Sequence, residues 1–100
     1  MKNPNYRHVG EVLFDEYLAP FQISTSELCK NTFLPITRVN AILKGTEKIN
    51  ADIALRLSKY FGTTARYWLW MQIEIDIKKA RAQHKDEHSK IHPLEKRTVA

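Results

Sequence analysis

The chain has 100 residues and a net charge of +5, with sixteen lysines and arginines against eleven aspartates and glutamates. This length fits one small domain with a modest core. The sequence has no signal peptide, lipidation motif or apolar run long enough to span a bilayer. A lone cysteine, Cys29, cannot form an internal disulfide, which suits the reducing cytoplasm. We therefore expect a cytoplasmic domain, whose calculated pI of about 9.5 favours polyanionic partners.

The first predicted helix runs from Val9 to Ala19. Val12, Leu13 and Tyr17 recur on one face of it, and Pro20 ends it because proline cannot continue an α-helix. His8, just before this helix, is expected to cap or pack and not to catalyse.

Residues 24–45 have the pattern of a helix-turn-helix. Ser24 and Glu27 match a capping box at the start of one helix. Pro35 suits the start of a second, and Gly45 suits its left-handed end. Between them, apolar residues recur at three- and four-residue intervals, at Ile36, Val39, Ile42 and Leu43.

The outer face of the second motif helix carries Thr37, Arg38, Asn40, Ala41 and Lys44. Most of these side chains can reach base edges or phosphates, and a helix this short fits the major groove of B-DNA. The simpler alternative is a solvated polar face, such as any small helical domain has.

Two further helices complete the predicted all-α, five-helix fold. Asn50 caps the fourth, which ends at Gly62, and Thr63 or Thr64 caps a fifth that runs to about Arg81. Residues 73–78 alternate with period two, as in a strand. The longer window of residues 64–81 contains no glycine or proline and favours a helix.

This fifth helix is expected to have two apolar faces. One face holds Trp68, Leu69, Ile73 and Ile77, and the other holds Tyr67, Trp70, Met71 and Ile75. A helix docked on so small a core needs only one apolar stripe, so the second set is interpreted as a homodimer interface. The alternative is that the domain buries both faces.

We expect a helix-turn-helix domain over residues 1–81 and a basic, flexible tail over residues 82–100. Residues 78–100 hold seven basic and three acidic side chains. His84, His88 and His92 have the four-residue spacing that could align imidazoles for a metal, but Pro93 and the surrounding charges favour a solvated tail. The sequence has neither a nucleophile–histidine arrangement nor a phosphate-binding glycine loop. We predict no catalytic residues, metal or cofactor, and a protein that is not an enzyme.

Four segments in order resemble one protein family. They are residues 8–13 (HVGEVL), the helix-turn-helix, residues 50–63 with NADIALRL and YFGT, and residues 68–72 with Trp68-Leu69 and Met71-Gln72. Together they resemble the HigA antidote proteins of toxin–antitoxin addiction modules, within the phage-repressor-like (XRE) helix-turn-helix group. The resemblance covers roughly residues 7–81. It implies an all-helical dimer that binds a cognate RNA-cleaving toxin and represses its own operon by binding the promoter.

The resemblance also implies which residues contact DNA. Thr25 matches a phosphate contact, and Lys44 and Lys48 match positions near the backbone. Arg38 can pair with guanine and Asn40 with adenine, or either can hold phosphate. The full predicted set is Thr25, Pro35, Ile36, Thr37, Arg38, Asn40, Ala41, Lys44 and Lys48.

The chain departs from the family pattern at Val9, Cys29, Thr32 and Phe33, where proline, alanine, leucine and glycine are common. The length of the motif is unchanged, so we expect Phe33 to keep the turn's left-handed backbone with positive φ. The alternative is a rearranged turn in which the Phe33 ring fills the space that Thr32 leaves in the core.

The function that these observations favour is an antitoxin and autorepressor that binds an inverted-repeat operator as a dimer. An orphan helix-turn-helix repressor without a toxin would share every DNA-binding residue. A protein-interaction module whose helix-turn-helix no longer binds DNA is a third possibility.

Overall fold

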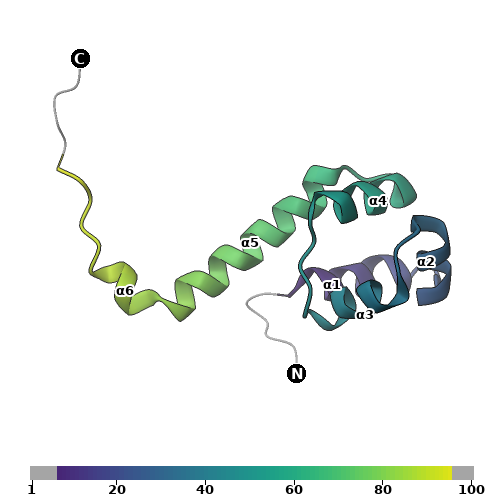
Figure 1. The fold of residues 1–100 in the computed structure, drawn as a ribbon, viewed down its shortest axis with the longest axis horizontal. Coiled ribbons are helices and arrows are strands. Elements are labelled where there is room, and N and C mark those ends of the chain that lie inside the picture. The colour runs from purple at the N-terminus through teal and green to yellow at the C-terminus, as the bar shows by residue number, and fades with distance from the viewer. Residues whose placement is uncertain (1–6, 96–100) are drawn as a thin grey trace, which may run out of the picture.

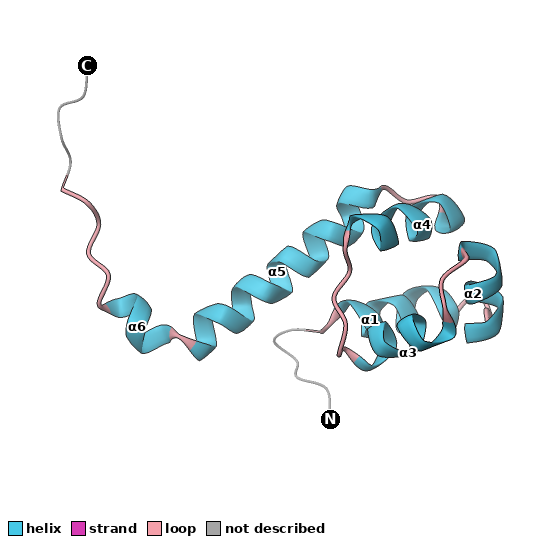
Figure 2. Ribbon diagram, viewed as in Figure 1, coloured by secondary structure: helices cyan, strands magenta, loops and turns pink. Residues whose placement is uncertain are grey.

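The computed structural model describes residues 7–95, which form helices joined by loops and turns, with no strand among them (Figures 1 and 2). In chain order the elements are α1 (Val9–Leu13), the π-helical segment η1 (Phe14–Leu18), α2 (Thr25–Thr32), α3 (Ile36–Lys44), α4 (Ala51–Phe61), α5 (Ala65–Gln83) and α6 (Lys85–Ser89). The predicted all-α fold is confirmed, but the predicted number of five helices is too low, because α6 forms within the predicted tail. The last five residues of the predicted tail lie outside the described part of the chain.

The first predicted helix is present but changes type. After Leu13 the backbone hydrogen bonds follow the π-helical pattern, in which each bond joins residues five apart and not four. The Ala19 N–H, for example, donates to the Phe14 carbonyl at 2.9 Å. Pro20 follows, and Gln22 turns the chain with a φ of 56°. Hydrophobic periodicity predicted the helix but carried no signal for its wider turns.

Polar caps start the helices largely as predicted. The Ser24 hydroxyl accepts from the Glu27 N–H at 3.0 Å, although the described structure gives no return bond from the Glu27 carboxylate. The complete capping box is instead at α1, where the Glu11 N–H donates to His8 Nδ1 and the His8 N–H donates to the Glu11 carboxylate. Asn50 caps α4.

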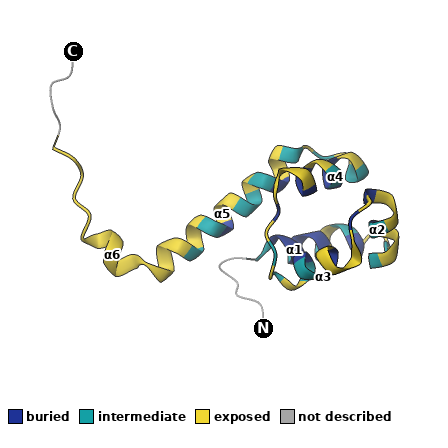
Figure 3. Ribbon diagram, viewed as in Figure 1, coloured by how far each residue is buried: buried dark blue, intermediate teal, exposed yellow. Residues whose placement is uncertain are grey.

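The core lies between α1, α2, α3, α4 and the part of α5 that runs to Ile75, and the rest of α5 extends away from it with α6 (Figures 1 and 3). Trp68 of α5 is fully buried, and its indole N–H donates to the Thr63 hydroxyl at 2.7 Å. The Tyr17 hydroxyl donates to Tyr67 at 3.2 Å, which links η1 to α5. Burial raises the pKa of Tyr67 to about 12.

The two faces of α5 are not divided as the sequence analysis expected. Ile75 is 5% exposed and belongs to the core, and Met71 packs against that core. Ile75 follows Trp68 by seven residues, which is two helical turns and therefore the same face. The side chains that point away from the core are Trp70, Ile73 and Ile77, which are 64%, 46% and 44% exposed.

The turn between α2 and α3 has the geometry expected of the motif. Phe33 has φ 60° and ψ 29°, in the left-handed region, and its ring is 83% exposed. The Arg56 guanidinium of α4 donates to the Thr32 and Phe33 carbonyls at 2.9 and 3.1 Å. Thr32 satisfies its own buried hydroxyl by donating to the Leu28 carbonyl. The rearranged-turn alternative is therefore wrong.

We expect Phe33→Gly to leave the free energy of unfolding unchanged or to raise it by up to about 1.5 kcal/mol. Relief of the left-handed strain is worth about 1–2 kcal/mol, and it is opposed by about 0.5–1 kcal/mol from the more flexible unfolded chain. Phe33→Ala is the matched control, because it removes the same exposed ring but keeps the strain. Urea denaturation should find the glycine variant more stable than the alanine variant. A loss of about 3–5 kcal/mol in both would mean that the ring is a core element.

Candidate nucleic-acid interface

α3 is fixed to the domain by its inner face. Val39 and Ile42 are 1% and 2% exposed, and α3 packs on both α1 and α2. The crossing with α1 is close because Gly10 has no side chain. A Cβ at that position would overlap the Ile42 carbonyl oxygen and lie 2.7 Å from the Leu43 Cα.

The predicted DNA-contacting residues lie at the start of α2, on and just before α3, and in the loop after it. Two of them, Thr25 at the start of α2 and Ala41 in the middle of α3, are partly buried. The others are exposed on α3, on the residue before it or on the loop after it: Pro35, Ile36, Thr37, Arg38, Asn40, Lys44 and Lys48. This surface, the α3 face, combines apolar, hydroxyl, amide and cationic groups.

Two of the three predicted cations on this surface already have carboxylate partners. Arg38 Nε lies 2.9 Å from the Glu47 carboxylate, and Lys48 Nζ lies 3.4 Å from that of Asp76 on α5. Sequence reasoning missed both acidic residues. Glu47 follows Arg38 by nine residues across the Gly45 turn, and Asp76 is 28 positions beyond Lys48, so no short-range spacing could have revealed either pair.

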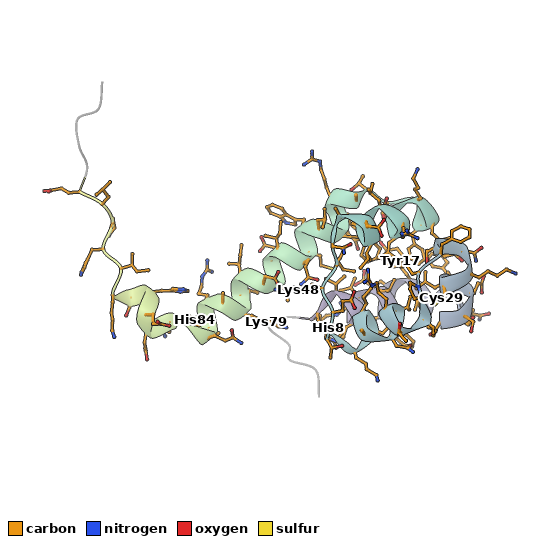
Figure 4. All side chains as sticks on the ribbon, in the orientation of Figure 1. His8, Tyr17, Cys29, Lys48, Lys79 and His84 are labelled. Atoms are coloured by element: carbon orange, nitrogen blue, oxygen red, sulfur yellow. The ribbon has the colours of Figure 1, made fainter. Side chains whose placement is uncertain are left out.

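The loop after α3 is attached to α5 by a second set of contacts. The Ile49 N–H donates to the Gln72 side-chain oxygen at 2.9 Å, and the Gln72 amide donates to Asp76 at 3.0 Å. Figure 4 shows Lys48 beside α5. These contacts with α5 therefore fix the position of the loop that carries Lys48, at the end of the α3 face.

The described residues give little support to metal binding or to a reactive cysteine. His84 interacts with Glu87 at 3.1 Å, and the His84 and His88 rings are 6.0 Å apart, but His92 follows the end of α6. Within residues 7–95 no group of three or more potential ligands is placed to hold a metal ion. Burial raises the pKa of the Cys29 thiol, which disfavours the reactive thiolate.

Among the helices of residues 7–95, none is both long enough and apolar enough to cross a bilayer.

Known proteins resemble this chain in both sequence and fold, although no family model matches it. Virulence-associated protein I of Dichelobacter nodosus is 42% identical over 87 residues, which are 87% of this chain and 80% of that protein. The structure of an addiction module antidote protein of a HigA family from Coxiella burnetii has a TM-score of 0.82 at 39% identity, covering 88% of this chain and 97% of its own. The chain belongs to the HigA family.

A second HigA structure is that of the Pseudomonas aeruginosa antitoxin with its higBA promoter. It is 37% identical, has a TM-score of 0.83 and covers 88% of this chain and 97% of its own. The relatives of this chain include helix-turn-helix transcriptional regulators and antitoxins, so the protein is a member of a regulatory family and not an enzyme.

Proposed function

We propose that this chain is a DNA-binding antitoxin that represses its own operon by inserting α3 into the major groove of an operator. The observation that carries the proposal is the α3 face: an outward surface of base- and phosphate-binding side chains on a helix whose inner face is buried. Membership of the HigA family supports the same function, because the Pseudomonas aeruginosa relative is described with its promoter.

The α3 face divides into two kinds of contact. Arg38 can donate two hydrogen bonds to a guanine, and Asn40 can pair with an adenine. Ile36 is 46% exposed and suits the methyl group of a thymine. Lys44 and Lys48, near the end of α3, suit the phosphate backbone, which sets register without reading sequence.

The exposed strip of α5 supports a homodimer. Trp70, Ile73 and Ile77 are spaced by three and four residues on one side of the helix, and Trp70 and Ile73 line an apolar hollow with Arg66, Tyr67 and Leu69. Two copies joined through this strip would present two α3 helices to DNA. The operator would then be an inverted repeat with half-sites about 10 base pairs apart, or a multiple of that.

The partner implied by the family is a cognate RNA-cleaving toxin, which the antitoxin neutralises in the cytoplasm. An orphan repressor without a toxin would use the same DNA-binding surface. Co-expression with the neighbouring reading frame, followed by purification and a mobility-shift assay on the upstream DNA, distinguishes the two. We expect a stable complex with a small basic protein that shifts the DNA. DNA binding without a partner would support the orphan repressor, and absence of both would overturn the proposal.

Arg38→Ala should weaken operator binding by about 1–3 kcal/mol and relax the preference at one base position per half-site. Lys48→Ala should weaken binding to operator and random DNA alike, and should flatten the salt dependence of log K by about one. Fluorescence anisotropy titrations on both DNAs at several salt concentrations measure these effects. Equal losses on both DNAs for Arg38→Ala would remove it from base recognition.

Trp70→Glu should give a helical monomer with poor operator affinity, because the charge enters the exposed strip. Ile75→Glu is the matched control on the same helix. It should unfold the domain or destabilise it by several kcal/mol, because the charge enters the core. Sedimentation and circular dichroism separate the two results. A Trp70→Glu protein that stays dimeric would place the interface elsewhere.

A further inference from the structure

A carboxylate stands beside the arginine expected to recognise a base. The Glu47 oxygen lies 2.9 Å from Arg38 Nε, the guanidinium nitrogen nearest the backbone. The Arg38 and Glu47 side chains are 43% and 34% exposed, so the pair lies at the surface of the α3 face. The two terminal guanidinium nitrogens lie beyond the contact, and these are suitable donors for the O6 and N7 of a guanine.

The backbone holds Glu47 in this place. Gly45 has φ 83°, which turns the chain back at the end of α3. The N–H groups of Thr46 and Glu47 then both donate to the Ala41 carbonyl, at 2.9 and 3.3 Å, and the Thr46 hydroxyl donates to it at 3.2 Å. The next residues are anchored to α5 through Lys48 and Ile49. The carboxylate therefore projects from a fixed turn and not from a loose loop.

We propose that Glu47 is a positioning residue that sets the specificity of the α3 face by orienting Arg38 and balancing its charge. This inference rests on the proposed DNA-binding function. A guanidinium held through Nε has fewer arrangements available, so less entropy is lost when it meets a guanine of the operator. The ion pair also keeps the Glu47 carboxylate close to any phosphate that approaches Arg38, and this negative charge lowers the attraction of the α3 face to DNA of any sequence.

The two effects act in opposite directions on the two kinds of DNA. On the operator, the fixed guanidinium gains its paired hydrogen bonds while Glu47 stays in contact. On random DNA, Arg38 either breaks its ion pair with Glu47 to neutralise a phosphate or approaches that phosphate with its charge already balanced by Glu47. Both options weaken its contribution to binding. Glu47 thus raises the ratio of operator affinity to random-DNA affinity.

The test compares Glu47→Gln with the wild-type protein on operator and random DNA over a range of salt concentrations. We expect random-DNA affinity to rise and its salt slope to steepen by about 0.9, the contribution of one further neutralised phosphate. The operator-to-random ratio should fall by about fivefold or more, the lower end of what one bidentate base contact is worth. Glu47→Ala should give the same direction, and circular dichroism melts of both variants should superimpose on the wild type, because an exposed ion pair contributes little to stability.

Asp86→Asn is the matched control. It makes the same change in net charge on α6, away from the α3 face (Figure 1), and should leave the operator-to-random ratio unchanged. The second control is Glu47→Gln in an Arg38→Ala background, where the ratio should no longer respond because Glu47 acts through Arg38.

The inference is overturned if Glu47→Gln, like Asp86→Asn, leaves the operator-to-random affinity ratio unchanged. It is also overturned if Glu47→Gln lowers this ratio as much in the Arg38→Ala background as in the wild type. A failure of the proposed function gives a different result. The wild-type protein itself would then show no preference for the operator and no salt-dependent binding.

Discussion

The close crossing of α1 and α3 at Gly10 is the contact on which the DNA-binding surface depends. Gly10 has no Cβ, so the two helix backbones meet directly, and Val39 and Ile42 are pressed into the core. Once these two side chains are buried, helical geometry decides which residues face outward. The composition of the α3 face is thus a consequence of core packing.

α5 connects this surface to the expected partner copy. Its inner side completes the core with Trp68 and Ile75, and it also holds the loop after α3 through Gln72 and Asp76. Its outer side carries the exposed apolar strip that contains Trp70. Because one rigid helix carries both sides, the distance between two α3 helices in a dimer is set by how the strips pair.

Local chemistry made much of the fold predictable from sequence. Capping residues predicted where helices begin, and residues suited to a left-handed backbone predicted where helices end. The conformation of the turn at Phe33 was predicted because the motif has its usual length. The prediction of which α5 residues face the core was wrong because apolar residues occur around most of the helix. Only the seven-residue interval from Trp68 to Ile75 marks the buried side. Glu47 was missed because a carboxylate nine residues from Arg38 becomes a neighbour only through the turn at Gly45.

The central claim is that α3 enters the major groove, and protection of guanine N7 from dimethyl sulfate on the upstream DNA tests it most directly. N7 is exposed in the major groove, so a bound recognition helix should shield it. We expect protected guanines in two segments related by inverted symmetry, with one guanine in each half-site regaining reactivity when Arg38→Ala is bound at saturation. Binding that shifts the DNA but leaves every guanine N7 reactive would contradict the account, because the protein would then be holding only the backbone or the minor groove.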